Sequence, residues 1–468
     1  MPTFTPSTAL SAPGKVLLAG GYLVLDQRHT GLVFGLSARI SVVAGAIRAD
    51  AEGVQIREIV VASPQFREAE WRYGYRLAPE GGGVTVTQLQ VGPVVPANLF
   101  VETTLSYALT YIDHITSAAK AGRGHGITSS RFVILADNDY YSQPEGPPAA
   151  GAGASTSTST STSTTTAAAA ASSRFATFPV PLSQANKTGL GSSAALVTAL
   201  TAALLTHYLP RELFDAASPR GRTALHNLAQ AAHCAAQGKV GSGFDVAAAV
   251  FGSCTYRRFS PDILARLPEP GTPGFGAALA AVVADPGWDA QVLADGVALP
   301  AGLVLRMCDV TCGSQTVGMV KKVLAWRAAE PDASARLWDD LQSANDLLGG
   351  ALRAGDLDAL PYRLGAVRAL IRDMGAASGV PIEPPSQTAL VDAASRIDGV
   401  YGGVVPGAGG FDAVVLLMRD DEATARRVED FLADWTRQGA SKVKLLGVKG
   451  EMEGVRQESL DTYSGWLS

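Results

Sequence analysis

Cysteine and charged residues are both scarce in this chain. The four cysteines, Cys234, Cys254, Cys308 and Cys312, are too few and too scattered for a disulfide scaffold, and no second pair completes a zinc site with the last two. We therefore expect buried free thiols in a reducing compartment, the cytoplasm. Only 17% of the residues are charged, the net charge is −5, and no block of Lys and Arg occurs. This composition gives no electrostatic footprint for nucleic acid or for a membrane surface.

Long apolar runs are also missing. The longest apolar helix that we expect, Ala194–Leu209, contains three threonines and is shorter than the ~20 residues of a membrane span. Residues 1–15 have no charged segment followed by an apolar one, so no secretory signal is predicted. Because 468 residues exceed the ~250–300 at which a single core stops growing, we expect two soluble domains. The proline-rich residues 260–300 suit an interdomain passage.

The regular part of the chain reads as a mixture of helices and strands. Hydrophobic periodicity predicts helices at 98–121, 223–237, 333–349, 356–378, 386–396 and 422–438, with strands at 39–44, 131–136, 304–308 and 442–448. Residues 142–173 break this pattern with prolines, a Gly-Ala stretch and a Ser-Thr repeat, which cannot bury enough apolar surface to become ordered. We predict a disordered insertion inside the first domain, because a strand pattern resumes at Phe175–Val180.

A glycine-rich turn enters a helix between Lys187 and Ala203. The first N–H groups of a helix have no internal partner and carry the positive end of the helix dipole, so this geometry predicts a phosphate site. Gly189 and Gly191 remove the Cβ atoms that would keep the backbone away from phosphate oxygens, and the serines that follow can cap the helix or bind Mg²⁺. The alternative is a serine-capped turn before an ordinary core helix.

One lysine and one aspartate stand out near glycine turns. Lys15 is the only charged residue of the apolar segment Ala9–Leu25, in which we predict turns at Pro13-Gly14 and Gly20-Gly21. Burying a lysine costs free energy unless the ammonium group meets an anion, so a functional role is favoured over a snorkelling side chain. Asp245 is the only acid in the glycine turn after residue 237, and the alternative role for it is a helix cap.

A polar stripe lies on the helix before that turn. His226, Gln230, His233 and Gln237 recur at spacings that put them on one helical face. A solvated face explains this pattern as well as a functional one does. A metal pair is less favoured, because the two histidines are separated by about 10 Å along the helix axis.

Several segments together resemble the GHMP kinases, the family of galactokinase, homoserine kinase, mevalonate kinase and phosphomevalonate kinase. Ala12–Lys15 resembles the first signature, Gly189–Ala195 the second, and the glycine turn from Gly402 to Asp412 the third, which packs against the phosphate loop. Gln237–Ala249 is most similar to the fungal phosphomevalonate kinases. The resemblance implies an α+β fold of two domains: an ATP-binding domain of the ribosomal protein S5 domain 2-like type at 1–260, and a ferredoxin-like domain at 301–468.

The resemblance also implies roles for single residues. Lys15 and Asp245 become catalytic residues, ATP and Mg²⁺ become cofactors, and Ser193 becomes a ligand of Mg²⁺. The predicted contacts to ATP are Lys187, Gly189, Leu190, Gly191, Ser192, Ser193 and Ala194. In mevalonate kinases a glutamate on the helix before the aspartate joins Mg²⁺, but residues 223–237 contain no acid, so Gln230 or a water would take its place.

The implied acceptor is (R)-5-phosphomevalonate, which would be converted to the diphosphate. Two anions must then meet, so extra cations are required, and Lys187 and Lys239 flank the two glycine turns. The predicted acceptor contacts are Lys239, Ser242 and Ser314. Mevalonate kinase activity, decarboxylation of mevalonate diphosphate and a catalytically inactive sensor remain alternatives, and the protein can be a monomer or a homodimer.

Overall fold

The computed structural model describes residues 3–48, 58–92, 94–119, 126–141, 174–311, 318–439 and 441–467. The predicted disordered insertion at 142–173 lies outside these ranges, and so do Ser314 and Cys312. The other three cysteines are buried and free, as expected from the sequence.

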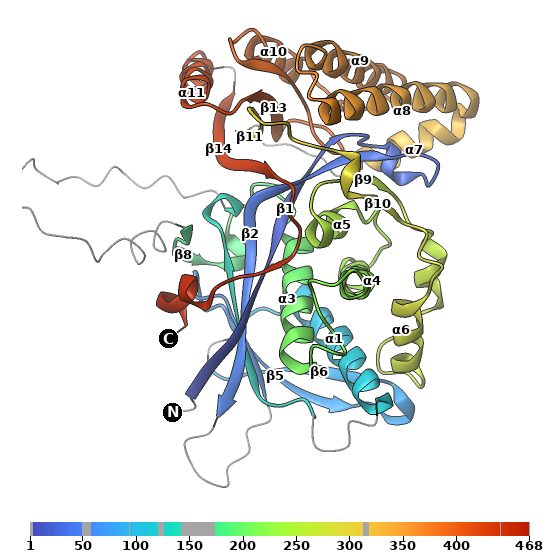
Figure 1. Cartoon of the computed structure of the whole chain (residues 1–468), viewed down its shortest axis with the longest axis vertical. Coiled ribbons are helices and arrows are strands. Elements are labelled where there is room, and N and C mark those ends of the chain that lie inside the picture. Colours follow the sequence, from blue (N-terminus) through green and yellow to red (C-terminus); the bar gives the residue numbers. More distant parts are fainter. Residues whose placement is uncertain are drawn as a thin grey trace, which may run out of the picture.

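One large mixed sheet runs through the described part of the chain (Figure 1). Its strands are β1 (Thr3–Ala19), β2 (Gly31–Arg48), β3 (Ile59–Ala62), β5 (Glu70–Leu77), β6 (Val84–Leu89), β7 (Ser130–Ala136), β9 (Cys254–Arg257), β10 (Gln291–Leu293), β11 (Leu303–Thr311), β12 (Val400–Val404), β13 (Ala413–Arg419), β14 (Lys442–Glu451) and β15 (Arg456–Gln457). The main order is β12-β13-β11-β14-β2-β7-β3-β5-β6. β14 pairs with β2, so the sheet continues from the C-terminal half of the chain into the N-terminal half. β4 (Phe66–Arg67) and β8 (Phe178–Pro181) form a separate parallel pair.

Helices cover this sheet in two groups (Figure 1). The first group packs beside β1 and β2 and consists of α1 (Leu99–Ala118), α3 (Ser192–Tyr208), α4 (Pro219–Gln237), α5 (Phe244–Phe251) and α6 (Phe275–Ala284). The second lies with β11–β14 and consists of α7 (Met319–Ala329), α8 (Pro331–Ala354), α9 (Leu360–Ser378), α10 (Pro385–Ala394) and α11 (Glu422–Arg437). The helices predicted from periodicity are confirmed, with ends shifted by a few residues. α3 is buried over most of its surface, as an apolar helix without a polar face should be.

Two sequence expectations about connections are wrong. Residues 260–300 contain α6 and β10, and α6 packs against α1 and α4, so this segment belongs largely to the first helix group. The predicted turn at Pro13-Gly14 is continuous strand in β1, and the irregularity lies on its partner: Ser37 and Ala38 of β2 are extra residues between Arg39, which pairs with Pro13, and Leu36, which pairs with Gly14. A bulge bends the strand pair locally, and here it lies opposite the residues just before Lys15. Gly14 is required because a Cβ atom there would lie 2.9 Å from the Leu190 carbonyl oxygen.

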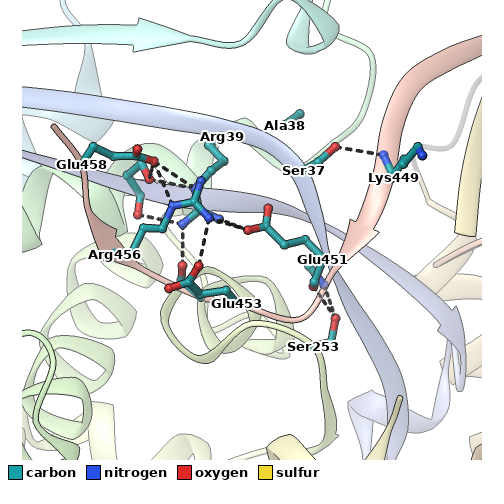
Figure 2. Close-up of polar contacts among 12 residues, drawn as sticks. Ser37, Ala38, Arg39, Ser253, Lys449, Glu451, Glu453, Arg456 and Glu458 are labelled. Atoms are coloured by element: carbon teal, nitrogen blue, oxygen red, sulfur yellow. Dashed lines mark hydrogen bonds and ion pairs between the residues drawn. The ribbon is translucent and has the colours of Figure 1, made fainter. Parts of the chain in front are cut away.

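The last part of β14 and the residues after it form a strap, residues 449–458, that crosses onto the N-terminal half. The strap contacts Arg39 of β2. The Arg39 side chain is 1% exposed, and its Nη1 atom lies 3.2 Å from Glu451 Oε1. Arg456 also binds Glu451, and Figure 2 shows the carboxylates of Glu451, Glu453 and Glu458 around the two guanidinium groups. Arg39 adjoins the β2 bulge and pairs with Pro13, so the strap contacts β2 opposite the residues just before Lys15.

Candidate active site

The phosphate turn precedes α3 as the sequence predicts, and glycine shapes it. Gly189 and Gly191 have φ angles of 76° and 83°, in the left-handed region that disfavours other residues. A Cβ atom at Gly189 would meet no heavy atom within 4 Å, so the turn is open on this side. Gly191 is the N-cap of α3, and no side chain caps the helix. The serine-capped alternative is therefore wrong, and the first N–H groups of α3 point to an open anion site.

Lys15 lies directly against this turn. Its backbone N–H donates to the Leu190 carbonyl at 2.9 Å, and a Cβ atom at Gly191 would lie 2.8 Å from Lys15 Cε. Lys15 Nζ is 5.4 Å from the ring centroid of Phe244. Burial lowers the pKa of Lys15, and the negative charge of Asp245 opposes this shift. β1 thus places the Lys15 side chain against the phosphate turn, which gives a reason for the single charge in an apolar strand.

Asp245 lies in the first turn of α5 and not in the glycine turn that precedes it, because α5 begins at Phe244. The N-cap of α5 is Gly243, with φ 87° and without a side-chain cap. Asp245 Oδ1 accepts a hydrogen bond from the N–H of Val246 at 3.0 Å, and 23% of the side chain is exposed. The carboxylate is therefore not the cap of the helix. Its Oδ2 atom lies 3.9 Å from His233 Nε2, and the same nitrogen lies 3.2 Å from Ser193 Oγ beside the phosphate turn.

His233 is the site residue that sequence reasoning did not identify. Its Nε2 atom lies 3.2 Å from Ser193 Oγ, 3.9 Å from Asp245 Oδ2 and 3.1 Å from the side-chain nitrogen of Gln237. Burial lowers the pKa of His233, and Asp245 again opposes the shift. The only signal in the sequence was the polar stripe on α4.

The rest of that stripe points inward too. His226, Gln230 and His233 are all buried, so the solvated-face alternative is wrong. His226 packs against Phe251 and Trp288, away from Ser193, so the two histidines do not form a metal pair.

Two side chains, one from β9 and one from the residue after it, donate hydrogen bonds to backbone carbonyls of the second glycine turn. Tyr256 donates its hydroxyl proton to the Ser242 carbonyl at 2.7 Å. Arg258 donates to the carbonyls of Gly241, at 3.1 Å, and of Leu25, at 3.0 Å. The predicted contact Lys239 is exposed in this turn, and Ser242 is partly buried. The sequence gave no local signal for Tyr256 or Arg258, because they lie outside the glycine motif.

An apolar pocket adjoins the phosphate turn. Its lining includes Phe66, Trp71, Asn98, Phe100, Tyr141, Leu182, Lys187, Ser192 and Ser193. Trp71 donates its indole N–H to the Pro96 carbonyl at 2.9 Å, which fixes one wall. Aromatic walls with a few polar groups suit a flat ring system, and the two serines connect the pocket to the anion site. Lys187, predicted beside the phosphates, lies at this junction.

The third predicted glycine turn contacts the end of β1. Gly407 donates its N–H to the Leu17 carbonyl at 3.0 Å, and Tyr22 donates its hydroxyl to the Ala408 carbonyl at 2.8 Å. It was expected to pack against the phosphate turn, but its contacts here reach the strand that carries Lys15.

A divalent cation fits this site only together with an anionic ligand. Ser193 Oγ and Asp245 Oδ2 lie 3.2 Å and 3.9 Å from His233 Nε2, so one hydroxyl and one carboxylate lie in the same neighbourhood. In the described ranges, no group of three or more His, Cys, Asp and Glu residues could hold a metal ion. Mg²⁺ is usually held by one or two carboxylates together with waters and substrate phosphates, which this donor set matches.

Comparison with known proteins gives consistent matches. The family models described as GHMP kinases N terminal domain and GHMP kinases C terminal match residues 177–253 and 357–437. A phosphomevalonate kinase of Gibberella zeae is 61% identical over 463 residues, which cover 99% of each chain, and one of Aspergillus fumigatus is 45% identical over 98% of each chain.

Solved structures share the fold across both halves. Streptococcus pneumoniae phosphomevalonate kinase in complex with phosphomevalonate and AMPPNP matches with a TM-score of 0.58 at 16% identity, covering 95% of this chain and 100% of that chain. A Listeria innocua protein, Lin0012, reaches a TM-score of 0.64 at 17% identity over 96% and 99% of the two chains. No helix within the described ranges combines the length and the hydropathy needed to cross a membrane.

Proposed function

The chain belongs to the GHMP kinase family, and from this premise we propose that it transfers the γ-phosphoryl group of ATP to (R)-5-phosphomevalonate, forming (R)-5-diphosphomevalonate and ADP in the mevalonate pathway of isoprenoid and sterol biosynthesis. The observation that carries this proposal is the 61% identity, along 99% of both chains, with a phosphomevalonate kinase. The meeting of Lys15, Ser193 and Asp245 around an open anion site supports it.

ATP binds with its phosphates on the phosphate turn and its base in the apolar pocket. The uncapped N–H groups at the start of α3 and the open side of Gly189 receive the phosphate oxygens. The base lies between the aromatic walls that include Trp71 and Phe100. Mg²⁺, held by Ser193 with Asp245 nearby, would neutralise phosphate charge when it is bound with the nucleotide.

Lys15 and Asp245 act on the acceptor by position and charge. The attacking oxygen belongs to a phosphate whose second pKa is about 6, so it is already ionised near neutral pH. Asp245 then has little need to remove a proton, and its carboxylate orients Lys15 and the acceptor. Lys15 neutralises the negative charge shared between the two phosphates during transfer. This division suits phosphoryl transfer, in which catalysis consists mainly of positioning and charge neutralisation.

The remaining acceptor contacts are assigned by their place around the second glycine turn. We assign Lys239 and Ser242 to the acceptor, because the turn that carries them leads into α5 and Asp245. Ser314 keeps the acceptor role expected from the sequence, as part of the segment between β11 and α7. The domain limits 1–260 and 301–468 stay part of this proposal, with α6 and β10 of the intervening segment packed against the first domain, and so does a cytoplasmic location. A relative in Arabidopsis thaliana is named peroxisomal, so microscopy of tagged protein is the test of location.

ADP release measured in parallel on four acceptors tests the activity. Phosphomevalonate should support turnover at least 100-fold above mevalonate, galactose and homoserine. Faster turnover of mevalonate would make the protein a mevalonate kinase. Absence of turnover on all four acceptors, in a protein that still binds ATP, would favour the inactive sensor.

A further inference from the structure

We propose that His233 is a positioning residue that accepts the proton of the Ser193 hydroxyl and thereby turns the oxygen lone pairs of Ser193 toward a nucleotide-bound Mg²⁺. This role rests on the proposed function, since it concerns how the same site receives the metal with ATP. Nothing in the family signatures quoted above assigns a role to this histidine.

The contacts around Nε2 define which ring nitrogen carries the proton. Gln237 presents its amide nitrogen to His233 Nε2 at 3.1 Å, and an amide nitrogen can only donate. With the Gln237 amide in this orientation, Nε2 is the acceptor and the ring proton resides on Nδ1. The Ser193 hydroxyl oxygen lies 3.2 Å from the same nitrogen, so its proton shares the single lone pair of Nε2 with the Gln237 amide. Asp245 Oδ2, at 3.9 Å, lies beyond hydrogen-bonding distance.

The direction of this hydroxyl matters for a cation. A serine that binds a cation does so through its oxygen lone pairs, so its proton must point away from the ion and needs an acceptor elsewhere. His233, on α4, supplies that acceptor for Ser193, which lies at the start of α3. Without it, the hydroxyl proton is free to point into the anion site and to compete with the metal.

The surroundings of His233 make it a fixed acceptor. The side chain is 3% exposed, and its ring lies 5.8 Å from the ring of Phe100. Its partner Gln237 follows one turn later on the same helix. A buried ring held on two sides loses little further freedom when the metal arrives, which is what positioning a ligand requires.

This arrangement also bears on the absence from α4 of an acidic residue that could bind the metal. The helix places a neutral hydrogen-bond acceptor, and no carboxylate, beside Ser193, so the metal gains no extra negative ligand from it. Binding of Mg²⁺ must then depend mainly on the nucleotide phosphates, with Ser193 adding orientation.

The test is the factor by which Mg²⁺ tightens ATP binding, measured by calorimetry in the full-length protein with MgCl₂ and with EDTA, without acceptor. His233→Leu should reduce this factor roughly fivefold to tenfold, the worth of one oriented hydrogen bond, while metal-free ATP binding stays unchanged. His233→Gln should keep most of the factor, because its amide oxygen can occupy the position of Nε2. His226→Leu is the matched control, since it changes a second buried histidine on the same helix away from Ser193, and it should leave the factor unchanged.

Two outcomes overturn the proposal: an unchanged factor in folded His233→Leu protein, or an equal loss in His226→Leu. If His233→Leu does not fold, His233→Met is measured instead and must show the same loss, because its thioether is only a weak hydrogen-bond acceptor. Failure of the proposed function is seen separately, as wild-type protein that binds MgATP but does not phosphorylate phosphomevalonate.

Discussion

Arg39, which is buried, forms an ion pair with the partly buried Glu451 at 3.2 Å, although the two residues come from opposite ends of the chain. Arg39 adjoins the β2 bulge, and Glu451 lies where β14 leaves the C-terminal half of the molecule. The strap also reaches the helix of Asp245, because Val455 donates its N–H to the carbonyl of Val250 in α5. The strap thus contacts β2, which pairs with the strand of Lys15, through an ion pair, and α5, which carries Asp245, through a backbone hydrogen bond.

Replacing Arg39 by Met should destabilise the protein by about 1–3 kcal/mol, because it leaves the partly buried carboxylates of Glu451 and Glu458 with one guanidinium group to share. The free energy of unfolding in urea measures this. Arg426→Met is the control, since Arg426 pairs with Glu422 at 3.2 Å on the exposed face of α11 and should cost less than about 1 kcal/mol. Equal losses in the two variants would show that the ion pairs of Arg39 add no more stability than an exposed ion pair does.

Acid should destabilise the fold partly through His226. Burial lowers the pKa of His226 in the folded protein, so the unfolded chain takes up a proton at a higher pH than the folded chain does. Stability is therefore complete above the unfolded value near 6.5 and falls as the pH decreases below it, by at most about 1.4 kcal/mol per pH unit for one group. The loss in free energy of unfolding between pH 7.5 and 5.5 should be smaller in His226→Leu than in the wild type. An equal loss in both proteins would exclude His226 as a contributor.

Local signals in the sequence were sufficient for most of the helices, with the exception of α6, and for the phosphate turn. Gly189 and Gly191 stand directly before an uninterrupted run of helix formers, so the anion site follows from neighbouring residues alone. The β2 bulge opposite Pro13 was missed because a bulge is defined by its partner strand, and a Pro-Gly pair by itself favours a turn. The Arg39 cluster joins segments from both ends of the chain, and no local pattern predicts such pairing.

The side chains to which we assign catalytic roles stand out in the sequence more clearly than the residues that contact them. Lys15 is the lone charge of an apolar segment, and Asp245 is the lone acid of a glycine-rich turn. His233 shares a helical face with His226, and periodicity alone cannot distinguish them. Which of the two reaches Ser193 depends on how α3 and α5 pack against α4, a tertiary relationship that the sequence of α4 does not contain.

The two lysines that flank the glycine turns should affect different substrates. Lys187 lines the pocket that we assign to ATP, whereas Lys239 is exposed on the turn leading to α5. Lys187→Met should raise KM for ATP, and Lys239→Met should raise KM for phosphomevalonate, each several-fold more than for the other substrate. Steady-state kinetics with each substrate varied in turn gives both constants. Equal rises for both substrates in either variant would contradict this separation.

Asp245 gives the most direct test of the mechanism. Its carboxylate accepts a hydrogen bond from Val246 and does not cap α5, whose N-cap is Gly243. Asn keeps an oxygen that can accept the same bond, so Asp245→Asn should fold normally while losing the negative charge beside Lys15. We expect kcat to fall by roughly 100-fold or more, within the range of ~10²–10⁴ for groups that act directly on the reaction, with ATP affinity little changed. Because Asp245 supports the charged form of Lys15, Lys15 should also lose its proton at lower pH in this variant, and the alkaline limb of the kcat profile should shift down. Near-normal turnover with an unshifted profile would reduce Asp245 to a structural residue of α5 and refute the mechanism.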